Sequence, residues 1–196
     1  SKTTQKRIKK YYGRESFVVY PFIDFDKFKN VEPVAGDYFL IVGRLAPWKR
    51  VDIAVEVFNE LDEELRIIGD GPDFSRLKSL AKPNIKLLGY LNDEEKIENM
   101  RRCKAVIITQ KEDFGIVPLE AMACGKPVIA YGGGGVTESV LPGKTGEFFN
   151  EQEFISLKNA VKSFDSSKYR APDCKERARE FDRDVFEDEI KRVINV

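Results

Sequence analysis

Residues 105–131 read AVIITQKEDFGIVPLEAMACGKPVIAY, and this stretch decides the fold. An apolar run of strand length (105–109) opens it, and a second apolar run (127–131) closes it. Between the two runs, apolar residues recur at helical spacing and a glycine stands where a helix would end: Leu119, Met122, Ala123 and Gly125. A buried strand, a helix and another buried strand at this separation predict a right-handed βαβ unit in a parallel sheet.

The same alternation of strands and helices continues on both sides of this unit. Further apolar runs lie at 38–43, 65–69, 85–89 and 146–149. Helix signals fall between or after them: apolar spacing from Ala54 to Leu61, Pro72 as a helix start, an Asn92–Glu95 capping box before Ile97 and Met100, and helical segments at 174–181 and 185–194. The predicted fold class is therefore α/β, a Rossmann-like parallel sheet of about six strands with helices on both faces.

Composition excludes several classes of protein. The 196 residues suit one domain, and 33 Lys+Arg balance 33 Asp+Glu, whereas a nucleic-acid-binding protein usually has a basic excess. The absence of histidine excludes Ser-His-Asp and Cys-His catalytic systems and histidine metal sites. No run approaches the roughly 20 apolar residues of a transmembrane segment. The three cysteines read as reduced, mostly buried thiols. We expect a cytoplasmic protein, with peripheral association at the inner face of the membrane as an alternative.

The first 28 residues differ from the rest. Residues 1–13 predict a short basic helix that Gly13 ends, with one apolar side that must pack against another element. Residues 18–28, VVYPFIDFDKF, predict a short strand interrupted by Pro21 and an inter-domain connector. Asp24 and Asp26 form a D-x-D pattern, which binds metal in other proteins. Because this D-x-D lies in a connector, we interpret it as a turn with solvated acids.

Two glutamates flank the start of the helix in the opening stretch. Glu112 follows the strand at 105–109, at the sheet end where parallel α/β proteins bind ligands. Residues 115–118 then form the helix N-terminus, whose free N–H groups and positive dipole attract anions, and Glu120 follows. An ionised carboxylate accepts both hydroxyls of a vicinal diol. The order carboxylate, anion site, carboxylate therefore matches a nucleoside diphosphate sugar.

Two cations are predicted at the same end of the sheet. Arg44 and Lys49 lie in GRLAPWKRVD (43–52), directly after the strand at 38–43. Together they can neutralise a diphosphate without a metal ion. We therefore expect no metal and no cofactor besides the donor substrate.

Four segments carry a family resemblance: GRLAPWKRVD (43–52), GYL (89–91), EDFGIVPLEAMACGKPVIAYGGGGVTE (112–138) and TGEFF (145–149). They resemble the donor-binding half of retaining GT-B glycosyltransferases of the family 4 type (glycosyltransferases group 1), a group that includes mannosyltransferases. The resemblance covers nearly the whole chain. It implies a division of the chain into the tail of an acceptor domain (1–17), an inter-domain connector (18–30), a donor-binding domain (31–181) and a C-terminal helix (182–196).

The resemblance also implies roles for individual residues. Arg44, Lys49 and Glu112 are implied to be catalytic, the two cations on the diphosphate and the glutamate on the donor sugar. Glu120 is implied to bind the ribose diol. Further positions complete the implied donor-binding set, with the base near the first two: Tyr90, Leu91, Gly43, Phe114, Gly115, Ile116, Val117, Gly134 and Gly135. Arg50 departs from the family, in which glycine often follows the lysine. The KRVD variant favours a mannose donor, so we expect GDP-mannose first and a UDP-sugar next.

The whole enzyme implied by the resemblance is larger than this chain. Its partners would be an N-terminal acceptor-binding domain of the same protein and a glycan or lipid-linked acceptor, and this chain alone would bind donor without transferring sugar. Two alternatives are a free-standing, non-catalytic nucleotide-binding module and an NAD(P)-dependent oxidoreductase. The latter draws on GDGPDF (69–74) and GGGGVT (132–137), but Phe74 and Thr137 replace the third glycine of the dinucleotide fingerprint.

Overall fold

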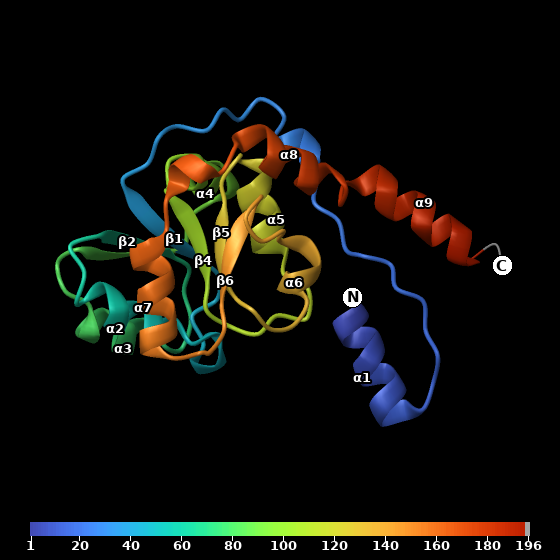
Figure 1. Ribbon diagram of the computed structural model, residues 1–196, viewed down its shortest axis with the longest axis horizontal. Coiled ribbons are helices and arrows are strands. Elements are labelled where there is room, and N and C mark those ends of the chain that lie inside the picture. The colour runs from blue at the N-terminus through green and yellow to red at the C-terminus, as the bar shows by residue number, and fades with distance from the viewer. Residues whose placement is uncertain (195–196) are drawn as a thin grey trace.

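The computed structural model describes residues 1–194, and its centre is a six-stranded sheet in which every neighbouring pair of strands is parallel (Figure 1). The strands are β1 (Tyr38–Val42), β2 (Glu64–Ile68), β3 (Ile85–Gly89), β4 (Ala105–Ile108), β5 (Val128–Tyr131) and β6 (Gly146–Phe149). Each strand boundary lies within one residue of the boundary predicted from its apolar run. The predicted Rossmann-like sheet is confirmed.

The strand order identifies one end of the sheet as the place for a ligand. The order is β3-β2-β1-β4-β5-β6, so the chain builds outward in one direction from β1 and in the other from β4. In open α/β sheets, ligands bind beyond the carboxyl ends of the strands at such a reversal. The loops after β1 and β4 therefore frame the expected site. These loops carry Arg44, Lys49 and Glu112.

Helices cover both faces of the sheet (Figure 1). Helices α4, α5 and α8 pack on one face, and helices α2, α3 and α7 pack on the other. The helices and short 3-10 turns (η) are α1 (Lys2–Tyr12), η1 (Phe25–Lys27), η2 (Pro47–Lys49), α2 (Val51–Phe58), α3 (Phe74–Leu80), α4 (Asp93–Arg101), α5 (Ile116–Ala123), α6 (Val136–Ser139), α7 (Phe154–Ser163), η3 (Ser166–Lys168), α8 (Ala171–Arg179) and α9 (Arg183–Ile194). The prediction of a C-terminal helix extended to residues 195 and 196, which lie outside the described residues.

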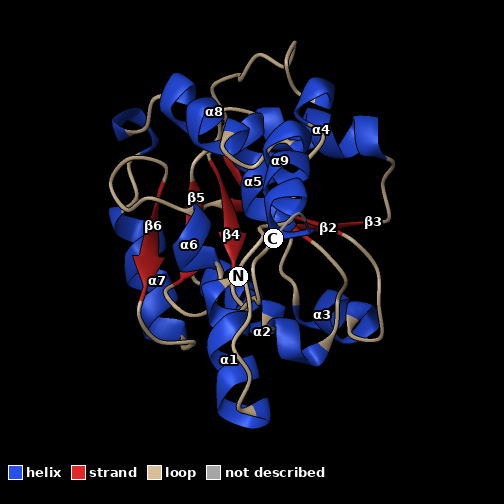
Figure 2. Cartoon of the chain, turned by 90° about the vertical axis from the view of Figure 1, so that its right-hand side faces the viewer, coloured by secondary structure: helices blue, strands red, loops and turns tan. Residues whose placement is uncertain are grey.

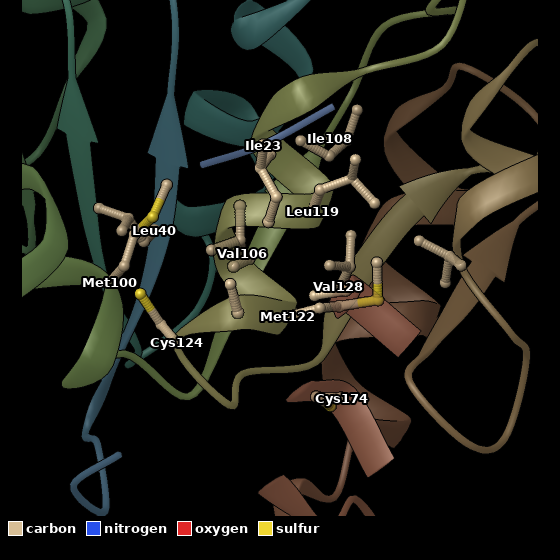
Figure 3. Close-up of a cluster of buried hydrophobic side chains, with 14 of the residues drawn as sticks. Ile23, Leu40, Met100, Val106, Ile108, Leu119, Met122, Cys124, Val128 and Cys174 are labelled. Carbon is tan, nitrogen blue, oxygen red and sulfur yellow. The ribbon is translucent and has the colours of Figure 1, made fainter. Parts of the chain in front are cut away.

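Each face of the sheet has its own hydrophobic core. Figure 3 shows Leu119 and Met122 of α5 meeting Val106 and Val128 of the strands in the first core. The second core lies between the strands and α2, α3 and α7. Side chains along β1 and β4 alternate between the two cores, as expected for strands buried on both faces. This double burial holds rigid the strand ends from which the site loops emerge.

The cysteines belong to these interior regions. Cys103, Cys124 and Cys174 are buried free thiols, as predicted. Burial raises the pKa of each to about 12. All three are therefore protonated and weakly nucleophilic at neutral pH.

Two terminal helices project beyond the sheet and its helical layers (Figure 1). Ser1 caps the start of α1, and Gly13 caps its end in the left-handed conformation (φ 64°) that permits the predicted stop. Tyr11 and Tyr12 are exposed on this helix. None of the helices within residues 1–194 is both long and apolar enough to cross a membrane.

The prediction of a strand within 18–28 is wrong. This segment forms a single bridge, between Ile23 and Asp182, and then the η1 turn. Its apolar character has another cause: Ile23, Phe25 and Phe28 enter the first core directly from the connector. Pro21 has no N–H group to offer to a strand ladder.

The predicted helix start at Pro72 is also wrong, by two residues. Pro72 lies in a turn, and α3 begins at Phe74. The turn is held to the loop after β1 by the N–H of Asp73, which donates to the carbonyl of Leu45 (3.0 Å). This bond belongs to a non-helical turn and delays the helix.

Candidate functional site

The loop after β1 is fixed to the end of β4 before it presents Lys49. Gly43 closes β1 with φ 153°, and its N–H donates to Ile68 at the end of β2 (3.0 Å). The buried hydroxyl of Thr109 donates to the carbonyl of Lys49 (2.6 Å). Gln152 in turn donates to the carbonyl of Thr109 (2.8 Å). The backbone of Lys49 is therefore held between the two strand ends that frame the site.

Arg50 adopts a conformation that favours glycine. Its φ is 53°, and it is the one residue other than glycine with positive φ among residues 1–194. The left-handed region costs a residue with a Cβ atom about 1–2 kcal/mol. The Arg50 side chain forms an ion pair with Asp52 (3.4 Å). Arginine in place of the family's glycine therefore introduces backbone strain at the start of α2.

The loop after β4 carries Glu112 and packs against two glycines. Glu112 forms a bridge with Gly134, and the N–H of Gly135 donates to the Glu112 carbonyl (2.7 Å). A Cβ atom on Gly134 would lie 2.2 Å from the Glu112 carbonyl oxygen, and one on Gly135 would lie 2.1 Å from that of Asp113. Only glycine permits this approach. The structure therefore places both glycines as supports for Glu112, and their direct contact with a donor stays a prediction.

The N-terminus of α5 has free backbone N–H groups where an anion site is predicted. The helix starts after Gly115, whose φ of 95° suits glycine alone. The backbone N–H groups of Phe114, Gly115 and Ile116 donate no hydrogen bond to any residue in the described part of the chain. Free N–H groups at a helix start, together with the helix dipole, bind phosphate. The free N–H groups that the prediction requires are therefore present, and anion binding by them stays a prediction.

Lys49 and Glu112 bond to each other. The Lys49 ammonium lies 2.8 Å from Oε1 of Glu112, and the two side chains are 25% and 23% exposed. The Gln110 amide donates to the same oxygen. Within residues 1–194, Oε2 of Glu112 has no hydrogen-bond donor. One oxygen thus fixes the carboxylate while the other can accept a ligand hydroxyl.

A second part of the site is a cavity of about 350 Å³ beyond the carboxyl ends of β1, β2 and β3. Its walls are Val42, Gly43, Arg44, Ile68, Gly69, Asp70, Tyr90, Leu91, Asp93 and Lys96. Four predicted residues, Gly43, Arg44, Tyr90 and Leu91, therefore meet here. Arg44 is exposed, and its guanidinium forms no ion pair within the described residues.

Lys96 joins this cavity to Glu120. Its ammonium lies 2.8 Å from Oε1 of Glu120 and 3.2 Å from Oδ1 of Asp93. Burial disfavours the charge on Lys96, but the hydrogen bonds and charges of Glu120 and Asp93 outweigh burial and raise its pKa. Lys96 is therefore a cation at neutral pH and holds Glu120 at the cavity edge.

Sequence reasoning missed both Lys96 and Asp93. The signal was available, because the Asn92–Glu95 capping box starts α4 just after β3, at the ligand end of the sheet. The first turn of α4 therefore had to face the site. A charged residue in that turn was a candidate for ligand contact.

Other predicted residues contribute backbone only or lie apart. The Phe114 ring is buried between Tyr20 (5.3 Å between centroids) and Phe181 (5.4 Å), so its N–H alone faces the anion site. Val117 packs against the first core, and Ile116 is partly exposed. Their roles toward a donor stay predictions.

The D-x-D pattern lies outside this site. Asp24 pairs with Arg183 (3.3 Å) and Asp26 with Lys29 (3.4 Å). No group of three or more Cys, Asp or Glu side chains positioned to hold a metal ion occurs within residues 1–194. Independence from metal stays a prediction.

Comparisons with known proteins identify the family of the chain. The family model described as "Glycosyl transferases group 1" matches residues 22–181. An uncharacterized glycosyltransferase, MJ1178, from Methanocaldococcus jannaschii is 35% identical over 133 residues, which is 64% of this chain and 38% of that protein. The human alpha-1,3/1,6-mannosyltransferase ALG2 is 29% identical over 158 residues, which is 76% of this chain and 37% of that protein.

A solved structure shares the fold over the whole chain. The crystal structure of Anabaena Alr3699/HepE in complex with UDP superposes with a TM-score of 0.85 at 23% identity, covering 100% of this chain and 62% of that one. The chain thus spans less than two fifths of the two curated relatives and under two thirds of the solved chain.

Proposed function

We propose, from the premise that this chain belongs to the glycosyl transferases group 1 family, that it binds the nucleoside diphosphate sugar donor of a glycosyltransferase. One observation carries the proposal. Three free N–H groups at the start of α5 lie between two glutamates, each held by its own lysine, beyond the adjacent strands β1 and β4 at which the strand order reverses. This arrangement can accept hydroxyls at two places and a diphosphate between them.

The order of these groups along the site defines a single orientation for the bound donor. The base would enter the cavity lined by Tyr90 and Leu91, and the ribose would meet Glu120 at the cavity edge. The diphosphate would lie on the free N–H groups of α5, close to Lys49 and Arg44. The sugar would then reach Glu112. Because each lysine orients its glutamate, both carboxylates are placed to accept hydroxyls.

The cavity chemistry supports guanine over uracil. Asp93 lines the cavity, and its carboxylate is 62% exposed on the side chain although Lys96 and Lys27 contact it. A carboxylate accepts only, and guanine offers it two adjacent donors, N1–H and the exocyclic amino group. Uracil offers one N–H between two carbonyls. We therefore propose GDP as the nucleotide, with UDP second.

Mannose is the proposed sugar. The human relative is named a mannosyltransferase, and the KRVD sequence at 49–52 resembles the mannosyltransferase-like subgroup. The Anabaena structure contains UDP, which supports a UDP-sugar as the second choice. Metal-free binding is supported by the positive groups of this chain, Arg44, Lys49 and the α5 N-terminus.

For the whole protein, we propose transfer to an acceptor hydroxyl with retention of configuration. The bond from the anomeric carbon to the β-phosphate oxygen breaks, and the acceptor oxygen bonds to that carbon from the same face. The departing phosphate oxygen takes the acceptor's proton. Lys49 and Arg44 would stabilise the charge that develops on the leaving group. A glycan or lipid-linked acceptor would be held by a separate acceptor-binding domain, so residues 1–196 alone would transfer no sugar.

The base preference can be tested by thermal unfolding with GDP, GDP-mannose, UDP, UDP-glucose and NAD⁺. A ligand that binds only the folded state stabilises it by about 2.7 kcal/mol at a hundred times its dissociation constant. We expect the guanine ligands to raise the midpoint most, and Asp93→Ala to remove their advantage over the uracil ligands. A shift with NAD⁺ alone would instead support the oxidoreductase alternative.

A further inference from the structure

Glu138 on α6 holds the start of α1 against the molecule. The backbone N–H groups of Lys2 and Thr3 donate to its carboxylate at 2.7 and 2.9 Å, and the Thr3 hydroxyl donates at 2.9 Å. The Tyr20 hydroxyl donates to the same carboxylate at 3.0 Å. One side chain thus accepts four hydrogen bonds from two segments that precede the sheet. Figure 2 shows the N-terminus of α1 close to α6.

In this contact, Glu138 accepts hydrogen bonds from N–H groups in the first turn of α1. The first N–H groups of a helix have no partner within the helix, and the dipole there favours a negative charge. Ser1 accepts from the N–H of Thr4 (3.1 Å), so Glu138 completes the capping of α1. Burial disfavours the charge on Glu138, but the N–H groups of Thr3 and Lys2 outweigh burial and hold its pKa below the ordinary value. The carboxylate is therefore ionised at neutral pH.

The same segments contact the loop that presents Glu112. The Ser1 hydroxyl donates to the carbonyl of Asp113, and the Arg7 guanidinium lies 2.9 Å from the Asp113 carboxylate. The Tyr20 ring, whose hydroxyl is bound to Glu138, packs against Phe114. On the other side, the loop at the start of α6 supports Glu112 through the N–H of Gly135. Residues 112–114 are therefore contacted by α1, by Tyr20 and by the loop at the start of α6.

We propose that Glu138 is a positioning residue for the donor sugar: it clamps α1 and Tyr20 onto residues 112–114 and so fixes Glu112. This inference rests on the proposed function, in which Glu112 contacts the sugar. Without the carboxylate, four donors lose their acceptor and the loop loses its outer support. The walls of the cavity and the Lys96–Glu120 pair include no residue of this clamp. The sugar contact should therefore weaken while nucleotide binding persists.

Calorimetric titration of GDP and of GDP-mannose into the wild-type chain and Glu138→Ala tests the inference. We expect Glu138→Ala to bind GDP-mannose about tenfold more weakly and GDP within about twofold of wild type. Glu138→Gln keeps an acceptor oxygen, so its affinity for GDP-mannose should lie between those of wild type and Glu138→Ala. Glu56→Ala, an exposed glutamate on α2, is the matched control and should bind both ligands as wild type does. Equal losses for both ligands, or no loss, would overturn the positioning role.

Hydrogen exchange separates this inference from the proposed function, because it needs no ligand. In Glu138→Ala, amide exchange should accelerate both at Lys2 and Thr3 and at Gly135, whose N–H donates to the Glu112 carbonyl. Acceleration confined to α1 would overturn the inference even if the chain binds donors. If the wild type binds neither ligand but the exchange pattern is as expected, the proposed function fails while the clamp on Glu112 stands. Should Glu138→Ala fail to fold, Lys2→Pro removes one N–H donor at a helix position that tolerates proline, and should accelerate exchange at Gly135 to a smaller extent.

Discussion

Replacing Lys49 with alanine is expected to weaken GDP binding by about 10- to 100-fold. The loss of one charge-assisted hydrogen bond to a diphosphate costs roughly 1.5–3 kcal/mol, and each 1.4 kcal/mol is a factor of ten. A second effect of this replacement also weakens GDP binding. Glu112 lies 2.8 Å from the Lys49 ammonium, so the variant exposes an uncompensated carboxylate to the diphosphate. Isothermal titration calorimetry measures the change.

Three companion variants separate these two effects. Lys49→Arg keeps the charge and should lose less affinity than Lys49→Ala. Glu112→Ala frees Lys49 for the diphosphate, so it should bind GDP at least as tightly as wild type while binding GDP-mannose more weakly. The double variant of Lys49 and Glu112 should recover part of the loss seen with Lys49→Ala, because the repulsion is gone. Wild-type affinity for GDP in Lys49→Ala would contradict the diphosphate assignment.

Replacing Glu120 with alanine should weaken GDP and GDP-mannose alike, again by about 10- to 100-fold. Both ligands carry the ribose, so both lose the same charge-assisted contact. The change also leaves Lys96, 18% exposed, with Asp93 as its remaining carboxylate partner at 3.2 Å. An equal loss for the two ligands distinguishes this glutamate from Glu112, whose replacement should affect the sugar-bearing ligand alone.

A ligand that lacks a ribose hydroxyl provides the matched control. The wild type should bind 2′-deoxy-GDP more weakly than GDP, and Glu120→Ala should bind the two with similar affinity. Lys96→Met should show a smaller loss, since it removes the group that orients Glu120 and leaves the carboxylate itself. If Glu120→Ala discriminates between GDP and its deoxy analogue as strongly as wild type does, Glu120 does not bind the ribose.

The elements that carry the site could be predicted from the sequence because their signals are local. Buried parallel strands appear as short apolar runs, and glycines mark their ends, so the sheet followed directly from 38–43 and 105–109. Parallel strands bring their carboxyl ends to one edge, which was enough to bring Lys49 and Glu112 together. The open start of α5 followed from Gly115.

What the sequence did not reveal depends on contacts between distant segments. Lys96 donates to Glu120 on another helix, and the capping box beside Lys96 places that lysine near the site without indicating its partner. Glu138 meets Thr3 across 135 positions of the sequence. The strand expected within 18–28 failed for the same reason, since its apolar side chains are buried by α8 and α9 and by the core rather than by strand neighbours. A local pattern shows that a side chain is buried without showing what buries it.

The most direct test of the account is calorimetric titration of GDP-mannose into this chain in EDTA, beside the same titration in magnesium. Trp48, the single tryptophan, is 67% exposed and precedes Lys49, so its fluorescence offers a second readout. Because Arg44, Lys49 and the free N–H groups of α5 supply the positive charge, the two affinities should agree within about threefold. Binding that requires magnesium, or the absence of binding by any nucleoside diphosphate sugar in either buffer, would contradict the account.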